Sequence, residues 1–413
     1  MPDGESRIMK KTLNHPFLMM LLIVALAPIG QMAIDIYVTA LPEMRNAFQV
    51  SQQSIQLSVT AYLVSFACGQ LFYGPIADAY GRKTALLAGL GLYMIGSLII
   101  LQTHAFPLFL AARVIQGLGI ASASVVMKAI APDNFSGQKL AHVMTYMVIG
   151  WGMGPIVAPV IGAQLQKHFG WESCLYFLFA YGVLLCGLTM FGYKESLKAP
   201  VPLRPRVMLK NIGAIFRSKE FHLNFLTMGL CYGVLLTFNL CAPFMVQDVL
   251  HQSPVFFGNI ALAMGLTYFA GVFSNRIIAG RIRAAVLCKT ASIINLACAA
   301  VMLFLANCYG LTLSALIVPP LIITFFAGVI FPNLMARSVA LFPQIAGLAS
   351  SLLGFSFTIC AGVIMYVSSL LRVDVLTPLA TLYVVVTALS LVMIFHLYAT
   401  RTQETAQAVP EVH

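Results

Sequence analysis

The segment "YKESLKAPVPLRPRVMLKNIGAIFRSKE", residues 193–220, interrupts an otherwise apolar chain near its middle. It contains seven Lys and Arg residues and a Pro-rich piece, followed by a short amphipathic stretch near 207–217. This combination is typical of a linker that lies along a membrane surface. We therefore expect two domains, one on each side of this linker.

The parts on either side of the linker are rich in long apolar runs. The 413-residue chain is 60% hydrophobic and 9% charged, whereas soluble domains carry about 25% charged residues. A helix needs about 20 apolar residues to cross a bilayer. We expect twelve such spans, at 17–41, 54–73, 84–102, 106–131, 140–164, 173–192, 221–247, 256–275, 290–308, 310–333, 344–370 and 375–398. The sequence thus predicts an all-α membrane protein with six-helix bundles over 17–192 and 221–398.

The positive charges are distributed unevenly between the two sides of this predicted membrane. With a cytoplasmic N-terminus, 19 of the 24 Lys and Arg residues fall in cytoplasmic segments. The others are Arg45, Lys167 and Arg372 on the outer side and Arg113 and Lys128 within a span. This asymmetry follows the positive-inside rule, so we expect cytoplasmic tails at 1–16 and 399–413. The net charge of +11 then reflects topology, and we expect no nucleic-acid partner.

One acidic residue lies inside a predicted span. Asp35 is the only one of the thirteen acidic residues so placed, and an Asp at a helix centre costs about 2.5–3.5 kcal/mol on insertion. Arg113 lies at a similar depth, since both residues are roughly 8–9 Å outward from the centres of their spans at 1.5 Å per residue. We hypothesise that Asp35 binds and releases a proton and that Arg113 stabilises its ionised form. The alternative is a structural ion pair that never titrates.

The two bundles repeat each other weakly. Residues 37–42 ("YVTALP") correspond to residues 238–243 ("FNLCAP"), 201 residues later. Paired six-helix repeats build many secondary transporters, which hold their substrate near the membrane midplane between the halves. By the same offset Asp35 corresponds to Leu236, so we expect the first half to handle protons.

The segment "GPIADAYGRK", residues 74–83, follows the second span and resembles the gating motif of the major facilitator superfamily. The resemblance covers almost the whole chain and implies the major facilitator fold, with two pseudo-symmetric six-helix bundles. Its motif residues in this chain are Gly74, Asp78, Gly81, Arg82 and Lys83. We expect Gly74 to permit close helix contact, Asp78 to face a helix N-terminus or an arginine, and Gly81 to form a tight turn. The family usually has a basic residue directly after the Asp, where this chain has Ala79.

A narrower resemblance is to the drug:proton antiporters of the Bcr/CflA type. It rests on "DIYVTALP" (35–42), "GQLFYGPIAD" (69–78), "RVIQGLG" (113–119), "GPIVAPVIG" (154–162) and "FPNLMARSVALFPQIAGLASSLLG" (331–354). The resemblance implies a role for Arg113 in proton coupling. It also implies an antiporter motif in the fifth span, made of Gly150, Gly154, Pro155 and Pro159. The glycines allow a neighbouring helix to pack closely, and the prolines deform the backbone.

Several polar residues are candidates for the wall of a central cavity. They are Gln31, Tyr62, Tyr146, Tyr232, Asn239 and Tyr268, and each has the alternative role of joining packed helices. Lys128 lies on one helical stripe with Arg113. It either faces the cavity, where it would favour an anionic or zwitterionic substrate over a lipophilic cation, or extends to the membrane surface as an anchor. His142 poses the same question, and we expect it at a helix end.

We expect a monomeric, proton-coupled transporter in the bacterial inner membrane. It would export a small organic compound, a drug or a metabolite, by alternating access, with protons as the coupling ion and no cofactor or metal. The alternative is a proton-symport importer or a dedicated transporter of a nutrient, a metabolite or a metal-chelating siderophore. A sensor without transport is disfavoured by the gating motif. An enzyme is not expected, because the chain has no nucleophile elbow, metal cluster or ATP-binding loop.

Overall fold

The computed structural model describes residues 16–197, 205–342 and 345–407. Within these ranges, twelve helices are long and apolar enough to cross a bilayer, as the sequence predicts. The predicted tail 1–16 lies outside the described residues except for Pro16, as do 198–204 of the linker and 408–413 at the C-terminus.

The first half forms six spans from nine helical elements. They are α1 (Pro16–Asp35), η1 (Val38–Ala40), α2 (Leu41–Phe48), α3 (Gln52–Tyr80), α4 (Arg82–Gln102), α5 (Phe106–Asn134), α6 (Gly137–Phe169), α7 (Glu172–Gly187) and η2 (Leu188–Gly192). The first span consists of α1, η1 and α2 together. A short helix, α8 (Pro205–Phe216), occupies the amphipathic part of the linker.

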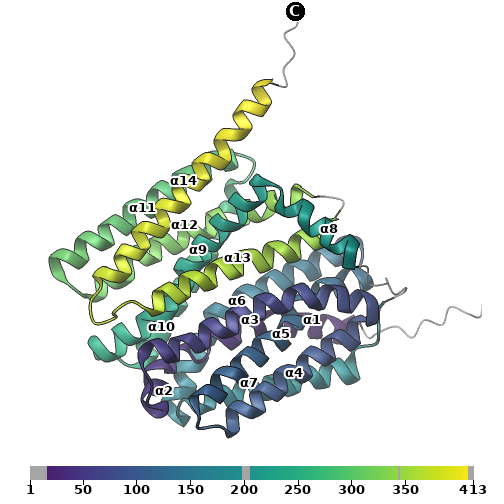
Figure 1. Ribbon diagram of the computed structural model, residues 1–413, viewed down its shortest axis with the longest axis horizontal. Coiled ribbons are helices and arrows are strands. Elements are labelled where there is room, and N and C mark those ends of the chain that lie inside the picture. Colours follow the sequence, from purple (N-terminus) through teal and green to yellow (C-terminus); the bar gives the residue numbers. More distant parts are fainter. Residues whose placement is uncertain (1–15, 198–204, 343–344, 408–413) are drawn as a thin grey trace, which may run out of the picture.

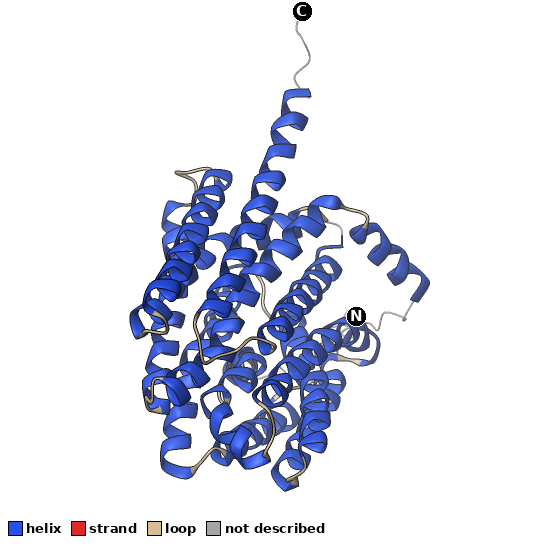
Figure 2. Ribbon diagram, turned by 60° about the vertical axis from the view of Figure 1, so that its left-hand side comes forward, coloured by secondary structure: helices blue, strands red, loops and turns tan. Residues whose placement is uncertain are grey.

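The second half repeats this arrangement. Its elements are α9 (Lys219–Phe244), η3 (Met245–Val249), α10 (Pro254–Ile278), α11 (Ala284–Tyr309), α12 (Leu313–Ala340), α13 (Ala346–Ser369) and α14 (Thr377–Gln407). The last helix continues past residue 398, where the sequence predicts its end, and extends beyond the bundle (Figure 2).

Local sequence signals explain where several helices begin. Ser51, Ser218 and Ser253 each precede a helix, and each side-chain oxygen accepts a hydrogen bond from the backbone N–H three residues later. Such N-caps satisfy one of the backbone donors that a helix leaves free at its start. The turn between α3 and α4 depends on Gly81, whose φ of +103° favours glycine.

The two halves are related by an internal repeat. The first span ends at Phe48 and the seventh at Val249, 201 residues later. In Figure 1 the first half (purple to blue) and the second half (teal to yellow) lie against each other. Helix α3 packs against α13, and α6 packs against α10. The sequence repeat therefore has a structural counterpart.

Hydrogen bonds between the halves concentrate toward one end of the bundle. We call this the Arg45 end, because it carries α2 with Arg45, and we call the opposite end, with the α3–α4 turn and α8, the Arg82 end. Arg45 Nη1 lies 3.0 Å from Asp248 Oδ2. Two further bonds at the Arg45 end run from Gln247 Nε2 to the Thr39 carbonyl (2.7 Å) and from Gln56 Nε2 to the Leu240 carbonyl (2.9 Å).

Candidate functional site

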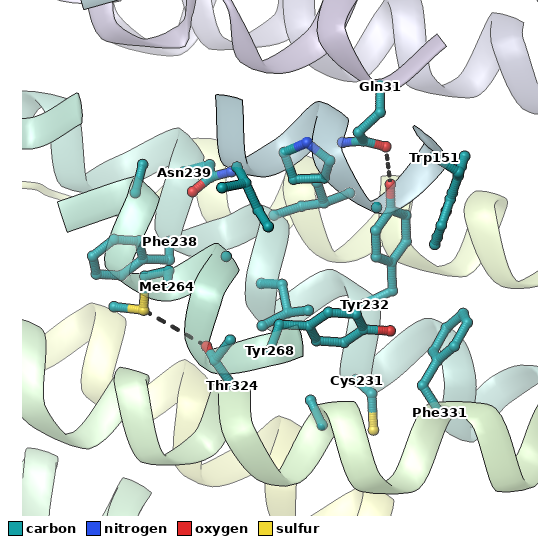
Figure 3. A pocket seen from close by; sticks show the side chains of 18 residues that line it. Gln31, Trp151, Cys231, Tyr232, Phe238, Asn239, Met264, Tyr268, Thr324 and Phe331 are labelled. Atoms are coloured by element: carbon teal, nitrogen blue, oxygen red, sulfur yellow. Dashed lines mark hydrogen bonds between the residues drawn. The ribbon is translucent and has the colours of Figure 1, made fainter. Parts of the chain in front are cut away.

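A cavity with about 830 Å³ of empty space, partly open to solvent, lies between the two halves. Helices α1 and α6 line it from the first half, and α9, α10 and α12 line it from the second. Its wall is largely apolar and includes the aromatic residues Trp151, Tyr232, Phe238, Tyr268 and Phe331 (Figure 3). A few polar groups in a mostly apolar wall are typical of sites for small organic molecules.

Four of the seven predicted cavity residues line this space. They are Gln31, Tyr232, Asn239 and Tyr268. The first comes from α1 and the other three come from α9 and α10. The cavity is thus built by both halves, and its polar groups meet near the boundary between them.

The other three predicted cavity residues do not line it. Tyr62 is fully buried beside Arg113, and its hydroxyl donates to the Gly30 carbonyl at 3.0 Å. Tyr146 is 48% exposed. At 100° per residue it lies about 120° around α6 from the lining residue Gly152, so it faces away from the cavity.

Lys128 also lies outside this cavity. It is exposed near the end of α5 that approaches Asp133, toward the Arg82 end. His142 is exposed near the start of α6, as expected for a helix-end histidine. Neither residue is among those that line the cavity.

Asp35 lies directly behind the cavity wall and is fully buried. Its Oδ2 accepts a hydrogen bond from Gln31 Nε2 at 2.8 Å, and its Oδ1 accepts one from Asn239 Nδ2 at 3.0 Å. Gln31 Oε1 in turn accepts a hydrogen bond from the Tyr232 hydroxyl at 2.7 Å (Figure 3). The carboxylate therefore joins the two halves through amide groups that themselves line the cavity.

Gln31 and Tyr232 are 201 residues apart, the same offset that relates the first and seventh spans. They therefore occupy equivalent positions in the two repeats. Equivalent positions can touch only where the pseudo-twofold axis passes between them. The hydrogen bond between these two side chains thus marks the axis of the molecule at the cavity wall.

Arg113 does not pair with Asp35, contrary to the expected ion pair. The ion pairs found among the described residues, such as those of Arg45, Arg82, Arg337 and Arg372, do not include Arg113 or Asp35. Arg113 Nη2 instead donates to the Ala33 carbonyl at 2.8 Å, and Nη1 donates to Gln116 Oε1 at 2.7 Å. Ala33 and Asp35 are two residues apart on α1, and such residues do not share a face of a helix. Arg113 and Asp35 therefore lie at similar depth without their charges coming together.

The guanidinium of Arg113 is held between two aromatic rings. Its Cζ lies 4.4 Å from the ring centroids of both Tyr37 and Tyr62. Cation–π contacts of this kind stabilise a buried arginine without a carboxylate partner. Arg113 therefore fixes the end of α1 through the backbone, one turn or less from Asp35.

The gating-motif residues form a cluster at the Arg82 end, within the first half. The Arg82 guanidinium donates to the carboxylates of Asp78 and Asp133. The Glu195 carboxylate accepts the backbone N–H groups of Arg82 and Lys83, both at 2.9 Å. Asp78 thus faces an arginine, one of the two predicted partners. Asp133, near the end of α5, and Glu195, in the segment after η2, were not identified from the sequence. Neither residue belongs to a motif that would have pointed to it.

We expected Gly74 to permit close helix contact, but its surroundings are not crowded. A Cβ at Gly74 would lie 3.9 Å from Val125, an ordinary contact, whereas one at Gly69 would lie 2.6 Å from the Ala121 Cβ. One turn and a residue earlier on α3, Gly69 therefore approaches α5 more closely than Gly74 does, and Gly117 of α5 lies closer still to α3, where a Cβ would overlap the Tyr62 carbonyl oxygen.

The glycines of the antiporter motif pack against α1. A Cβ at Gly150 would lie 2.9 Å from the Ala27 Cβ, and one at Gly154 would lie 3.0 Å from the Gln31 Cβ. Pro155 lines the cavity, and the backbone carbonyl of Pro159 lies against Gly258 of α10. Helix α6 remains continuous through both prolines. The motif thus sets the position of Gln31.

Comparison with known proteins identifies the family. Residues 20–366 match the family model described as the Major Facilitator Superfamily. The chain belongs to this superfamily. The superfamily consists of membrane transporters rather than enzymes, which agrees with the cavity between two bundles and with the twelve spans.

Characterised and solved relatives extend over nearly the whole chain. Multidrug resistance protein D of Escherichia coli (strain K12) is 28% identical over 88% of this chain and 91% of its own length. The bicyclomycin resistance protein homolog of Haemophilus influenzae is 29% identical over 84% and 88%. MdtL, a multidrug resistance protein of Salmonella typhimurium, is 28% identical over 94% and 96%. The crystal structure of a D-xylose-proton symporter has a TM-score of 0.70 at 12% identity, over 93% of this chain and 97% of that chain, and shows the shared fold.

Proposed function

We propose that this major facilitator protein exports a small organic compound in exchange for protons. It would act as a monomer in the bacterial cytoplasmic membrane, with both termini in the cytoplasm and with no cofactor or metal. The positive-inside charge distribution supports this orientation. The named drug-resistance relatives support efflux as the direction of transport.

The observation that carries the proposal is the position of Asp35. A fully buried carboxylate in a membrane span is costly and is commonly part of an ion or proton pathway. Asp35 contacts two cavity-lining amides, one from each half. Its charge therefore acts on both the substrate space and the contact between the halves, which is the requirement for coupling proton binding to transport.

Alternating access is supported by the uneven contacts between the halves. The Arg45 end is joined by an ion pair and hydrogen bonds. Toward the Arg82 end, α6 exposes Met144, Val148 and Ile149, which lie on more than one of its faces. With the proposed orientation the Arg45 end faces the outside, so we take this conformation as closed to the outside and open toward the cytoplasm.

The substrate class follows from the cavity wall. Its apolar and aromatic side chains offer large contact area with specific geometry, and a few amide and hydroxyl groups stand among them. Lys128 is not among the residues that line this wall, so its charge is not part of the proposal.

The test uses inside-out vesicles with an imposed proton gradient and a pH-sensitive dye. Lipophilic cations, neutral antibiotics, amino acids and polycarboxylate chelators are added to wild type, Asp35→Asn and Asp374→Asn. Asp374 lies in an exposed loop paired with Arg372, so its variant makes the same charge change away from the cavity. We expect at least one compound class to dissipate the gradient in wild type and Asp374→Asn only. Full exchange in Asp35→Asn would refute the role of Asp35, and proton-linked accumulation in right-side-out vesicles would establish import instead.

A further inference from the structure

We propose that Gln31 and Tyr232 form a relay that reverses the hydrogen-bonding character of the cavity wall when Asp35 gains or loses a proton. With Asp35 ionised, Tyr232 offers the cavity an acceptor. With Asp35 protonated, Tyr232 offers it a donor. This inference rests on the proposed function, because it takes Asp35 as the proton site, and it adds the chemistry by which substrate and proton exclude each other.

The ionised state fixes every donor in the chain of contacts. A carboxylate only accepts hydrogen bonds, so both of its neighbours must turn N–H groups toward it. Gln31 does this with Nε2, which leaves Oε1 facing Tyr232, and the tyrosine hydroxyl must then donate to that oxygen. The proton of Tyr232 is thus committed to Gln31. The lone pair of its oxygen remains for a molecule in the cavity.

Protonation of Asp35 exchanges donors and acceptors along the chain of contacts. Only the Gln31 amide turns over and the Tyr232 hydroxyl rotates. Asn239 Nδ2 holds Oδ1 of Asp35 as an acceptor, so the added proton resides on Oδ2, the oxygen that faces Gln31. The new O–H donates to Gln31 Oε1 after the amide turns over about its last bond. Nε2 then donates to the Tyr232 oxygen, and the tyrosine O–H rotates toward the cavity. One proton is added at Asp35, and each later step is a change of donor.

The surrounding groups leave Asp35 as the site where the charge changes. The titratable and charged groups packed around the relay are Arg113 of α5, Tyr37 beside η1, Tyr62 of α3, and Cys231 and Tyr268 of the second half. Arginine, tyrosine and cysteine ordinarily keep their protons at neutral pH. Gln31 is held at the position of closest approach to Gly154, which keeps it between Asp35 and Tyr232.

The relay predicts which compounds exchange for protons. A substrate with an N–H or O–H group binds the Tyr232 acceptor while Asp35 is ionised. Protonation then replaces that acceptor with a donor, and the substrate is released. Proton and substrate thus compete although they share no atom. Among compounds that exchange, congeners methylated at the donor should bind about tenfold more weakly.

Infrared difference spectroscopy between high and low pH tests the relay without a known substrate. The protein is reconstituted in lipid with ring-labelled tyrosine. We expect a carboxylic acid C=O band from Asp35 and a shift of one tyrosine C–O band, both absent in Asp35→Asn. Tyr232→Phe should lose the tyrosine band and keep the carboxylic acid band. Tyr268→Phe, which removes a hydroxyl from the same cavity, should keep both.

The outcomes separate the relay from the proton site. An Asp35 band without any tyrosine shift in wild type would overturn the relay and leave the proton site in place. A tyrosine shift that persists in Gln31→Met would also overturn the relay. The charge of Asp35 would then act on Tyr232 electrostatically and not through the Gln31 amide. Absence of the Asp35 band would refute the proposed function together with the relay.

Discussion

The ion pair between Arg45 and Asp248 should hold the Arg45 end closed. The two charged atoms are 3.0 Å apart, and the side chains are 28% and 33% exposed. Such a partly exposed pair contributes about 0.5–1 kcal/mol, which corresponds to roughly a two- to fivefold change in a two-state population. Arg45→Gln or Asp248→Asn should therefore increase the fraction of molecules open at this end by about that factor.

Distance measurements by pulsed electron spin resonance can report this change. After the native cysteines are replaced, spin labels are placed on Ala47, which is exposed on α2, and on Gln252, which is exposed in the loop after η3. We expect the long-distance population to rise in each single variant and to approach wild type in the charge-exchanged variant Arg45→Asp/Asp248→Arg. The difference should shrink as salt is added, because partly exposed charges are screened.

Two results would refute this reasoning. The first is an unchanged distance distribution in both single variants, which would mean that the remaining hydrogen bonds alone close the Arg45 end. The second is a charge-exchanged variant as open as Arg45→Asp alone, which would mean that the arginine acts through other contacts. One such contact is the cation–π approach of Arg45 to Phe244, at 5.7 Å.

Three further predictions concern single positions. Gly162→Ala should destabilise the purified protein by about 1–3 kcal/mol in thermal unfolding, because its Cβ would overlap the backbone of the first span; Gly91→Ala, with open space around it, should not. Glu195→Gln should speed hydrogen exchange of the first two amides of α4 about tenfold, because they lose a charged acceptor. Arg113→Lys should lower the unfolding temperature, because one ammonium group cannot replace both guanidinium bonds; an unchanged transition would contradict the anchoring role.

Hydropathy and charge were enough to predict the twelve spans, since crossing a bilayer imposes length and composition on each helix. Counting along a helix also gave the depth of Asp35 and Arg113. It did not give the direction in which each side chain points, because the rotation of a helix is set by its neighbours. The arginine consequently binds a backbone carbonyl of α1 and not the carboxylate.

The same limit explains the outcome for the cavity residues. Gln31 is four residues before Asp35, and the repeat offset places Asn239 at the position equivalent to residue 38, just after Asp35. Both side chains donate a hydrogen bond to Asp35 in the structure. Tyr146 has no such relation and lies on the far face of α6. Trp151 and Phe331 line the cavity, but aromatic residues on lipid-facing surfaces look identical in a sequence.

The contact between Gln31 and Tyr232 shows where the internal repeat departs from symmetry. Two identical copies of a six-helix unit would carry the same side chain at both positions. Neither side chain would then be the fixed donor or the fixed acceptor of a hydrogen bond between them. In this chain the two equivalent positions hold an amide and a phenol. Asp35 lies beside Gln31, and Leu236 stands at the corresponding position of the second half. The contact therefore has a distinct donor and acceptor, and in the proposed relay one proton exchanges them.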